Sequence, residues 1–217
     1  PAQYFRKQFS SNKKVASATA YITAHGMYEA QINGKRVGDY YLTPGWTSYK
    51  KRLQYQVYDV TRLVSNGNNA IGVIAGNRWY RGFLACGGNK DIYGKKTGVL
   101  FQLEINYTDG TTATIISDES WRSSTGSIRF SEIYHGETID AREEKAGWST
   151  AGYNDAGWSA VNIGNYTNEN LLATYNEPIK KQETFKPFKI FTTPKGEKVI
   201  DFGQNLVGWV VVKAKGN

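Results

Sequence analysis

The chain has 217 residues, of which 40% are hydrophobic, 14% aromatic and 21% charged. The aromatic and β-branched content is too high for an intrinsically disordered protein, and no apolar run reaches the ~18 residues that cross a bilayer. The formal net charge of +8 raises the question of an acidic partner. The lysines lie mainly near turn signals, however, where they keep strand edges soluble.

Segments of alternating side chains begin close to the N-terminus. Residues 17–24 and 28–32 alternate with a period of two, which is typical of half-buried strands. Asn33-Gly34 follows the second segment directly. Because both central residues of a type I′ turn have positive φ, this pair predicts a hairpin. A helical turn is expected at most over residues 60–64.

The same pattern continues through the middle of the chain. Residues 69–75, 101–107 and 111–116 are predicted strands, and Asp109-Gly110 is a second hairpin signal. Many short strands separated by turns predict an all-β protein with a jelly-roll β-sandwich.

A domain boundary is expected after residue 166, where the chain becomes rich in asparagine. We therefore expect a jelly-roll module over residues 1–166, a linker over 167–188 and the first strands of a second β-domain over 189–217. The strands of this last part are predicted at 189–192, 199–202 and 207–212. Alternatively, they complete the first domain.

A series of short motifs, in this order and spacing, resembles the amino-terminal non-catalytic module of bacterial α-L-rhamnosidases, a galactose-binding-like jelly roll. The resemblance extends over essentially the whole chain. The motifs lie at residues 28–39, 44–49, 52–61, 67–72, 79–82, 118–121, 136–142 and 201–209, the last of which is similar to the opening of that family's next β-domain.

The resemblance implies a parent enzyme with a large (α/α)₆ barrel, which hydrolyses terminal α-L-rhamnosyl bonds with inversion. No stretch of this chain has the helical periodicity of such a barrel, so we expect no catalytic residue here and no activity of this piece alone. The implied partners are rhamnose-containing glycans or glycosides and the barrel of the same protein. The sequence does not identify the cellular compartment, although an extracytoplasmic or periplasmic parent is expected.

One acidic cluster could suggest glycoside hydrolysis, which needs two facing carboxyl groups. It contains Glu137, Asp140, Glu143 and Glu144 beside His135. Arg142 and Lys145 lie next to it, so a surface ion-pair network is the simpler interpretation.

Carbohydrate binding is predicted for a glycine-rich stretch that mixes aromatic and polar side chains. Sugars stack their C–H faces on aromatic rings and hydrogen-bond through their hydroxyls. The candidate residues are Trp79, Tyr80, Asn89, Asp91, Tyr93 and Glu137. An alternative is that Trp79 and Tyr80 cover the core as a lid. The other tryptophans, including Trp46, are expected in core or inter-domain packing.

No metal or other cofactor is predicted. Cys86 is the one cysteine and no cysteine-based metal site can form. Some members of the resembled family bind rhamnose with calcium, but the stretch that often supplies Asp or Asn has Ser48, Lys50 and Lys51 here. Cations there oppose a divalent ion, so calcium remains possible but doubtful.

Two other functions stay open from the sequence. The module could be a pure structural scaffold for the barrel. A basic β-sandwich could instead bind nucleic acid through stacking aromatics and lysines, although we favour no nucleic-acid and no membrane partner.

Overall fold

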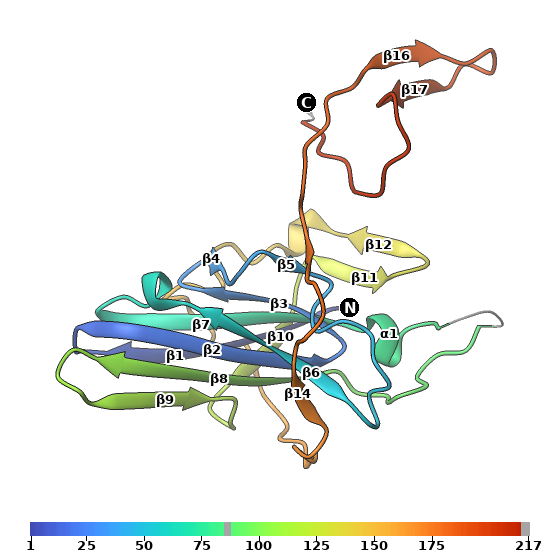
Figure 1. The fold of residues 1–217 in the computed structure, drawn as a ribbon. Helices are drawn as coiled ribbons and strands as arrows, with labels where there is room; N and C mark the ends of the chain where they lie inside the picture. The colour runs from blue at the N-terminus through green and yellow to red at the C-terminus, as the bar shows by residue number, and fades with distance from the viewer. Residues whose placement is uncertain (85–87, 214–217) are drawn as a thin grey trace. The chain divides into compact units, whose positions relative to one another are not determined.

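The structure is a computed structural model that describes residues 1–84 and 88–213, so the prediction on Cys86 lies outside the described residues. The chain forms two compact units, Pro1–Lys180 and Lys181–Asn217. Figure 1 shows that strands dominate the fold. Among the described residues, no helix has the length and apolar character needed to cross a membrane.

A six-stranded sheet forms one layer of the first unit, in the order β13-β10-β1-β7-β3-β4. All of its neighbouring strands are antiparallel. Its strands are β1 (Gln3–Ser11), β3 (Met27–Ile32), β4 (Lys35–Arg36), β7 (Gly67–Gly76), β10 (Arg122–Thr125) and β13 (Ser159–Ala160).

A five-stranded sheet forms the opposing layer, in the order β14-β6-β2-β8-β9. Only β14 pairs in parallel, along β6. Its strands are β2 (Val15–His25), β6 (Leu53–Asp59), β8 (Gly98–Tyr107), β9 (Thr112–Ile116) and β14 (Leu171–Ala173). Two facing sheets of short strands confirm the prediction of an all-β jelly-roll sandwich.

Short elements complete the unit at its edges. They are the hairpin of β11 (Ile128–Glu132) and β12 (Gly136–Ile139), the pair of β5 (Tyr40–Tyr41) and β15 (Ile179–Lys180), the 3₁₀ turns η1 (Thr61–Leu63) and η2 (Ala141–Glu143), and the helix α1 (Arg78–Arg81). The helical turn expected over residues 60–64 is therefore present, but α1 was not foreseen. Both β14 and β15 lie within the range expected as linker; β14 pairs with β6 of the sandwich and β15 with the edge strand β5.

The main core lies between the two sheets and depends on alternation along β2. Small side chains at Ala18, Ala20 and Ala24 and the larger Ile22 are all at most 1% exposed. Small residues allow the facing sheet to approach with its larger side chains, and each fully buried aliphatic or aromatic side chain contributes about 1.5–3 kcal/mol. The facing and flanking members include Tyr28, Ile32, Ile71, Val73, Phe101, Leu103, Ile105 and Trp121.

The first predicted hairpin is present between β3 and β4. Asn33 and Gly34 have φ of 52° and 76°, as a type I′ turn requires. The Asn33 side chain also donates to Oδ1 of Asn69 at 2.6 Å and to the carbonyl of Leu63 at 2.9 Å. The turn is thereby fixed to β7 and to η1. The second hairpin, β8–β9, is also present around Gly110, which has a φ of 82°.

The outer face of the six-stranded sheet is buried by an irregular segment, residues 145–158. Trp148 and Trp158 of this segment pack against Tyr4 of β1 and are buried. Trp148 lies directly over Gly72 of β7, where the ring leaves no room for a Cβ. The sheet is therefore covered on both faces.

The fully buried side chain of Arg6, in β1, binds this segment. Its guanidinium donates to the carbonyls of Trp148 at 2.8 Å, Thr150 at 3.1 Å and Tyr153 at 3.4 Å, and it forms an ion pair with Asp155. A planar fork with five N–H donors suits this set of converging acceptors. Arg6 thus satisfies the backbone of a segment that has no strand partner over most of its length.

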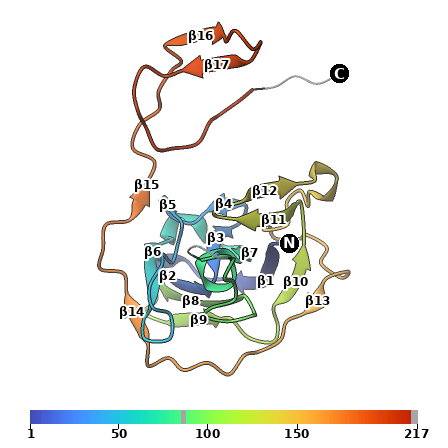
Figure 2. The same cartoon turned by 90° about the vertical axis from the view of Figure 1, so that its right-hand side faces the viewer.

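The crossing segment, residues 161–170, connects β13 at the edge of one sheet to β14 at the edge of the other. Figure 2 faces the end of the sandwich and shows the chain passing from β13 to β14 along the lower edge of this view, below β8 and β9. Val161 packs against the core, and the Asn170 side chain donates to the carbonyl of Tyr49 at 2.9 Å. The segment is therefore held at both of its ends.

The second unit contains one described hairpin, of β16 (Lys189–Thr192) and β17 (Lys198–Asp201). Both strands were predicted. The strand predicted over 207–212 is wrong for the described structure, because these residues form no regular element and their apolar side chains are exposed. Sequence alternation favours a strand only where a neighbouring strand supplies hydrogen bonds.

We predict that Arg6→Ala lowers the free energy of unfolding of the chain by about 3 kcal/mol, because it leaves three carbonyls and a carboxylate without their donor. Arg6→Lys should recover part of this loss, since it keeps the charge without the planar fork. Urea unfolding followed by tryptophan fluorescence measures both. Arg122 provides the control, because it is exposed and pairs with Arg6 in the β1–β10 register. Arg122→Ala should change the free energy of unfolding by under ~0.5 kcal/mol. Equal losses at the two positions would contradict this role.

Candidate functional site

The candidate residues gather at one end of the sandwich, where β2 and β7 finish and β6 and β8 begin. Three connections meet at this end: residues 42–52 before β6, the described residues 77–84 and 88–97 between β7 and β8, and the crossing segment. Figure 2 shows α1 at the centre of this end. Loops on a rigid sandwich are common positions for binding sites.

An aromatic platform forms here from Trp46, Trp79, Tyr93, Tyr49 and Tyr80. The indoles of Trp46 and Trp79 are stacked, with centroids 6.4 Å apart and planes 20° apart. Trp46 is 54% exposed, and its Nε1 donates to the Tyr93 hydroxyl at 3.3 Å. The platform therefore presents a large apolar ring surface to solvent.

Two rings of the platform, those of Tyr80 and Tyr49, are buried and contact neighbouring rings. Tyr80 is buried and stacks on His25 with centroids 4.4 Å apart and planes 4° apart. Tyr49, also buried, meets Tyr80 and Tyr93 edge-on at 5.4 and 4.9 Å. Burial, and then the neighbouring Tyr93, raise the pKa of the Tyr49 phenol. Burial also raises the pKa of the Tyr80 phenol. The Tyr49 and Tyr80 phenols therefore remain uncharged at neutral pH, and the platform interacts through ring faces and hydroxyls.

Polar side chains border the platform. Nε of Arg81 lies 3.8 Å from Oδ1 of Asp91, and the Asp91 amide donates to the Arg81 carbonyl at 3.2 Å. Asp91 has a φ of 58°, a left-handed conformation that Asp tolerates better than most residues. Asn89 accepts from the amide of Leu84 through its carbonyl at 2.8 Å. The loop between α1 and β8 is thus closed by its own backbone.

The β11–β12 hairpin holds the base of this loop. The carboxylate of Glu132, 4% exposed, accepts from the amide of Phe83 at 3.1 Å and from its neighbour Ile133 at 2.9 Å. Glu137 accepts from Ser131 at 3.0 Å and lies 3.9 Å from Nη2 of Arg78. Glu132 was not singled out from the sequence, where its burial has no local signal.

The structure brings Trp79, Tyr80 and Tyr93 into one network of rings. Asp91 pairs with Arg81 and Glu137 with Arg78, the two residues that flank Trp79 and Tyr80 in the sequence, and Asn89 lies in the loop that follows α1. Trp46 does not pack in the core, because it is 54% exposed on the platform, and the expectation of inter-domain packing stays a prediction. In contrast, Trp121, Trp148 and Trp158 are buried, as expected. The sugar-binding role of the candidate residues stays a prediction.

Side chains of the acidic cluster contact different partners. Arg142 pairs with Asp140 at 2.6 Å and holds the pKa of that carboxyl below its usual value. Glu144 accepts instead from the Ser127 hydroxyl at 2.6 Å. His135 packs edge-on against Phe83 at 4.9 Å. Within residues 1–84 and 88–213, no group of three or more His, Cys, Asp or Glu side chains is arranged to hold a metal ion.

Residues 47–52, where the resembled family often places calcium ligands, do not fit that ion. The Thr47 hydroxyl donates to the Arg52 carbonyl at 2.5 Å, and the Ser48 carbonyl already accepts from the amides of Lys51 and Arg52. The stretch contains no carboxylate, whereas calcium sites commonly use several. Exposed Lys50 and Lys51 add positive charge.

We predict that the free energy of unfolding falls when the pH is lowered from about 7 to 5. Burial lowers the pKa of the His25 imidazole below its usual 6.5, so the unfolded chain binds this proton more readily than the folded chain. The stability that neutral His25 supplies is present above the pKa of His25 in the unfolded chain, and it is lost as the pH falls below that value. In urea unfolding at several pH values, His25→Gln should reduce this fall in the free energy of unfolding. His135→Gln should leave the fall unchanged. An unchanged pH slope in His25→Gln would contradict the prediction.

We further predict that Glu132→Ala lowers the free energy of unfolding by roughly 2 kcal/mol, because the buried amide of Phe83 loses its acceptor. Thermal or urea unfolding measures the loss. Glu143→Ala, which removes an exposed carboxylate from η2, should cost under ~0.5 kcal/mol. A Glu132→Ala chain as stable as Glu143→Ala would show that the carboxylate does not hold the loop.

Comparison with known sequences identifies the family of this chain. The family model for the α-L-rhamnosidase N-terminal domain matches residues 13–183. An α-L-rhamnosidase of Streptomyces avermitilis is 40% identical over 218 aligned positions, which cover 100% of this chain and 21% of that protein. One from Formosa agariphila is 38% identical, over 96% of this chain and 22% of that protein.

Solved structures agree with this likeness. The crystal structure of native α-L-rhamnosidase from Aspergillus terreus matches 96% of this chain and 24% of its own, with a TM-score of 0.93 and 45% identity. The Streptomyces avermitilis enzyme in complex with L-rhamnose matches 94% of this chain and 20% of its own, with a TM-score of 0.89 and 39% identity. The chain spans about a fifth to a quarter of these relatives, and it belongs to the family of α-L-rhamnosidase N-terminal domains.

Proposed function

We propose that this chain is a non-catalytic accessory module of an α-L-rhamnosidase, which supports the catalytic barrel and binds carbohydrate. The parent reaction under this proposal is hydrolysis of terminal α-L-rhamnosyl residues. In the acidic cluster, Glu137, Asp140 and Glu144 favour the non-catalytic role, because each forms an ion pair or a hydrogen bond within the module. The proposed module boundary near residue 166 and the linker over 167–188 remain predictions.

Carbohydrate binding rests on one observation, the stacked pair of the exposed Trp46 and the half-buried Trp79. Exposed flat rings on a rigid scaffold bind the C–H face of a sugar at a small cost in side-chain entropy. Tyr93 fixes Trp46 by a hydrogen bond, and Asp91 with Arg81 supplies acceptors and donors for sugar hydroxyls. The L-rhamnose complex of the Streptomyces avermitilis relative makes rhamnose the first ligand to test.

Support of the barrel is favoured by the apolar side chains of residues 206–212 in the second unit. Val207, Trp209 and Val211 are 105%, 60% and 78% exposed. Contiguous exposed apolar surface commonly marks a contact with another protein part. We propose that the rest of the parent enzyme covers these residues.

We predict that Trp79→Ala weakens binding of L-rhamnose and rhamnosides by at least about tenfold, because it removes one face of the ring pair. Asp91→Ala should also weaken binding, by loss of a hydrogen-bond acceptor. Calorimetric titration measures both variants, with Tyr175→Ala as the control because Tyr175 is 69% exposed and lies outside the platform.

The same titrations separate a binding module from a pure scaffold. Unchanged affinity in Trp79→Ala and Asp91→Ala, or no heat with any rhamnoside, would refute the binding role and favour the scaffold. Kinetics of the full-length parent on polymeric rhamnosides then tests support of the barrel, since a scaffold role predicts an effect of deleting the module but not of Trp79→Ala.

A further inference from the structure

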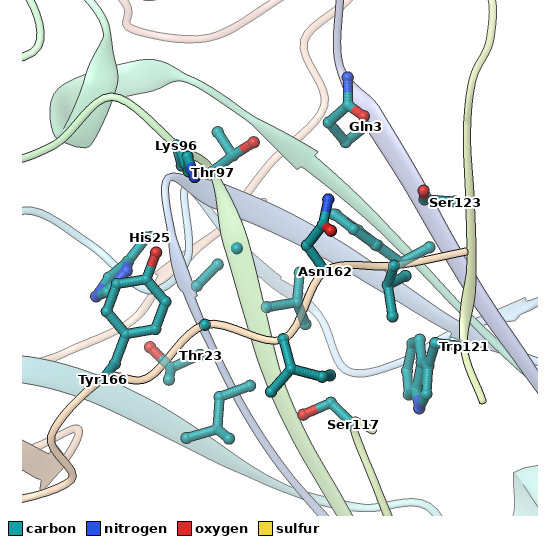
Figure 3. Close-up of a pocket in the computed structure, with 18 of the residues that line it drawn as sticks. Gln3, Thr23, His25, Lys96, Thr97, Ser117, Trp121, Ser123, Asn162 and Tyr166 are labelled. Carbon is teal, nitrogen blue, oxygen red and sulfur yellow. The ribbon is translucent and has the colours of Figure 1, made fainter. Parts of the chain in front are cut away.

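A cavity of about 610 Å³ lies beside the platform, beneath the crossing segment. Its volume falls within the ~300–1,000 Å³ that is typical of small-molecule sites. Figure 3 shows Asn162 and Tyr166 on the crossing segment, with Thr23, Ser117 and Trp121 around the same space. His25 lines this cavity and stacks on Tyr80 of the platform.

The crossing segment is fixed over the cavity by a ring contact. Tyr166 meets His25 edge-on with centroids 4.6 Å apart, although Tyr166 itself is 52% exposed. Pairing of β13 with β10 and of β14 with β6 holds the two flanks. The roof of the cavity is therefore anchored at its middle and on both sides, and the space below it is a structural feature of the fold.

The cavity lining combines apolar surface with hydrogen-bonding groups. Phe5, Val99 and Trp121 contribute rings and methyl groups. The side-chain amides of Gln3 and Asn162 have no hydrogen-bond partner within the part of the chain that the structure describes. Such a mixture of ring faces, amides and hydroxyls is suited to a saccharide, which has both C–H faces and hydroxyls.

The charged lining residues make the cavity electropositive. Lys95, Lys96 and Arg81 line it on one side, and the acid Asp118 lines it on another. Asp118 is already neutralised by Lys7, whose Nζ lies 2.7 Å from its Oδ2. Arg81 is partly engaged by Asp91, whereas both lysines are exposed and have no ion-pair partner among the described residues. Two adjacent unpaired cations at the rim favour an anionic ligand.

From this combination we infer that the cavity binds an anionic saccharide, a sugar that carries a carboxylate or a sulfate. The hydroxyl and amide groups contact the ring of the sugar, and Lys95 and Lys96 contact its anionic group. A lysine ammonium binds either anion as a point charge, so the two sources share one chemistry. This site is separate from the platform and does not depend on the proposed binding of rhamnose there.

The test is an NMR-detected titration of the 217-residue chain with D-glucose, D-glucuronate and D-glucose 6-sulfate. These sugars differ only at C6, so any preference reports on the charge. We expect at least one charged sugar to bind roughly tenfold more tightly than glucose, with shifts at the amides of His25 and Thr97. Whether D-glucuronate or D-glucose 6-sulfate binds more tightly shows whether the site prefers a carboxylate or a sulfate.

Matched lysine pairs provide the variants. Lys95→Gln with Lys96→Gln should remove the preference for the charged sugar. Lys50→Gln with Lys51→Gln, a second pair of adjacent exposed lysines that does not line the cavity, should leave it unchanged. Because all four side chains are exposed, the free energy of unfolding should remain within ~0.5 kcal/mol of the parent chain, which separates binding from folding.

Three outcomes would overturn the inference: equal affinity for charged and neutral sugars, equal losses in the two double variants, or no binding of either charged sugar. Trp79→Ala keeps this result distinguishable from the platform. It should weaken rhamnose binding and retain the preference for the charged sugar, so that either site can fail while the other stands.

Discussion

Burial of the six-stranded sheet on both of its faces is the constraint on which the rest of the structure depends. One face packs on the opposing sheet, and the other is covered by Trp148 and Trp158. The covering segment is irregular, so its carbonyls need donors that a sheet would normally supply. Arg6 provides them and is itself dehydrated in doing so. A buried guanidinium is tolerable only because its N–H groups find acceptors in the carbonyls and in Asp155.

The rigid sandwich gives the loops at one end a fixed base, and aromatic contacts continue that rigidity outward. His25 at the end of β2 stacks on Tyr80, Tyr80 contacts Tyr93, and Tyr93 holds the exposed Trp46. A ring that is already ordered loses little entropy when a ligand binds to it. The same histidine contacts Tyr166 over the neighbouring cavity. The half-buried imidazole of His25 therefore lies between the two proposed sugar sites.

The distribution of positive charge explains why net charge alone is a poor guide to partners. Lys7 and Lys13 pair with Asp118 and Asp109, and such exposed pairs reduce the field that a partner experiences. Lys95 and Lys96 differ because they lie at the rim of a cavity that also offers amides and ring faces. Position beside a concave surface, rather than the total of +8, gives these lysines a specific function in our proposal.

The sequence by itself determined the strands with clear alternation (β2, β3, β7, β8, β9, β16 and β17), the Asn33-Gly34 hairpin, the all-β class and the family. Alternation, positive-φ turns and ordered motifs are local properties of the chain. Only the tertiary structure decided that Trp46 is exposed and stacked on Trp79, that Arg6 and Glu132 are buried, and that residues 207–212 form no described strand. Each of these outcomes depends on residues distant in sequence. A side chain is buried, or a strand forms, only when another segment supplies the surface or the hydrogen bonds.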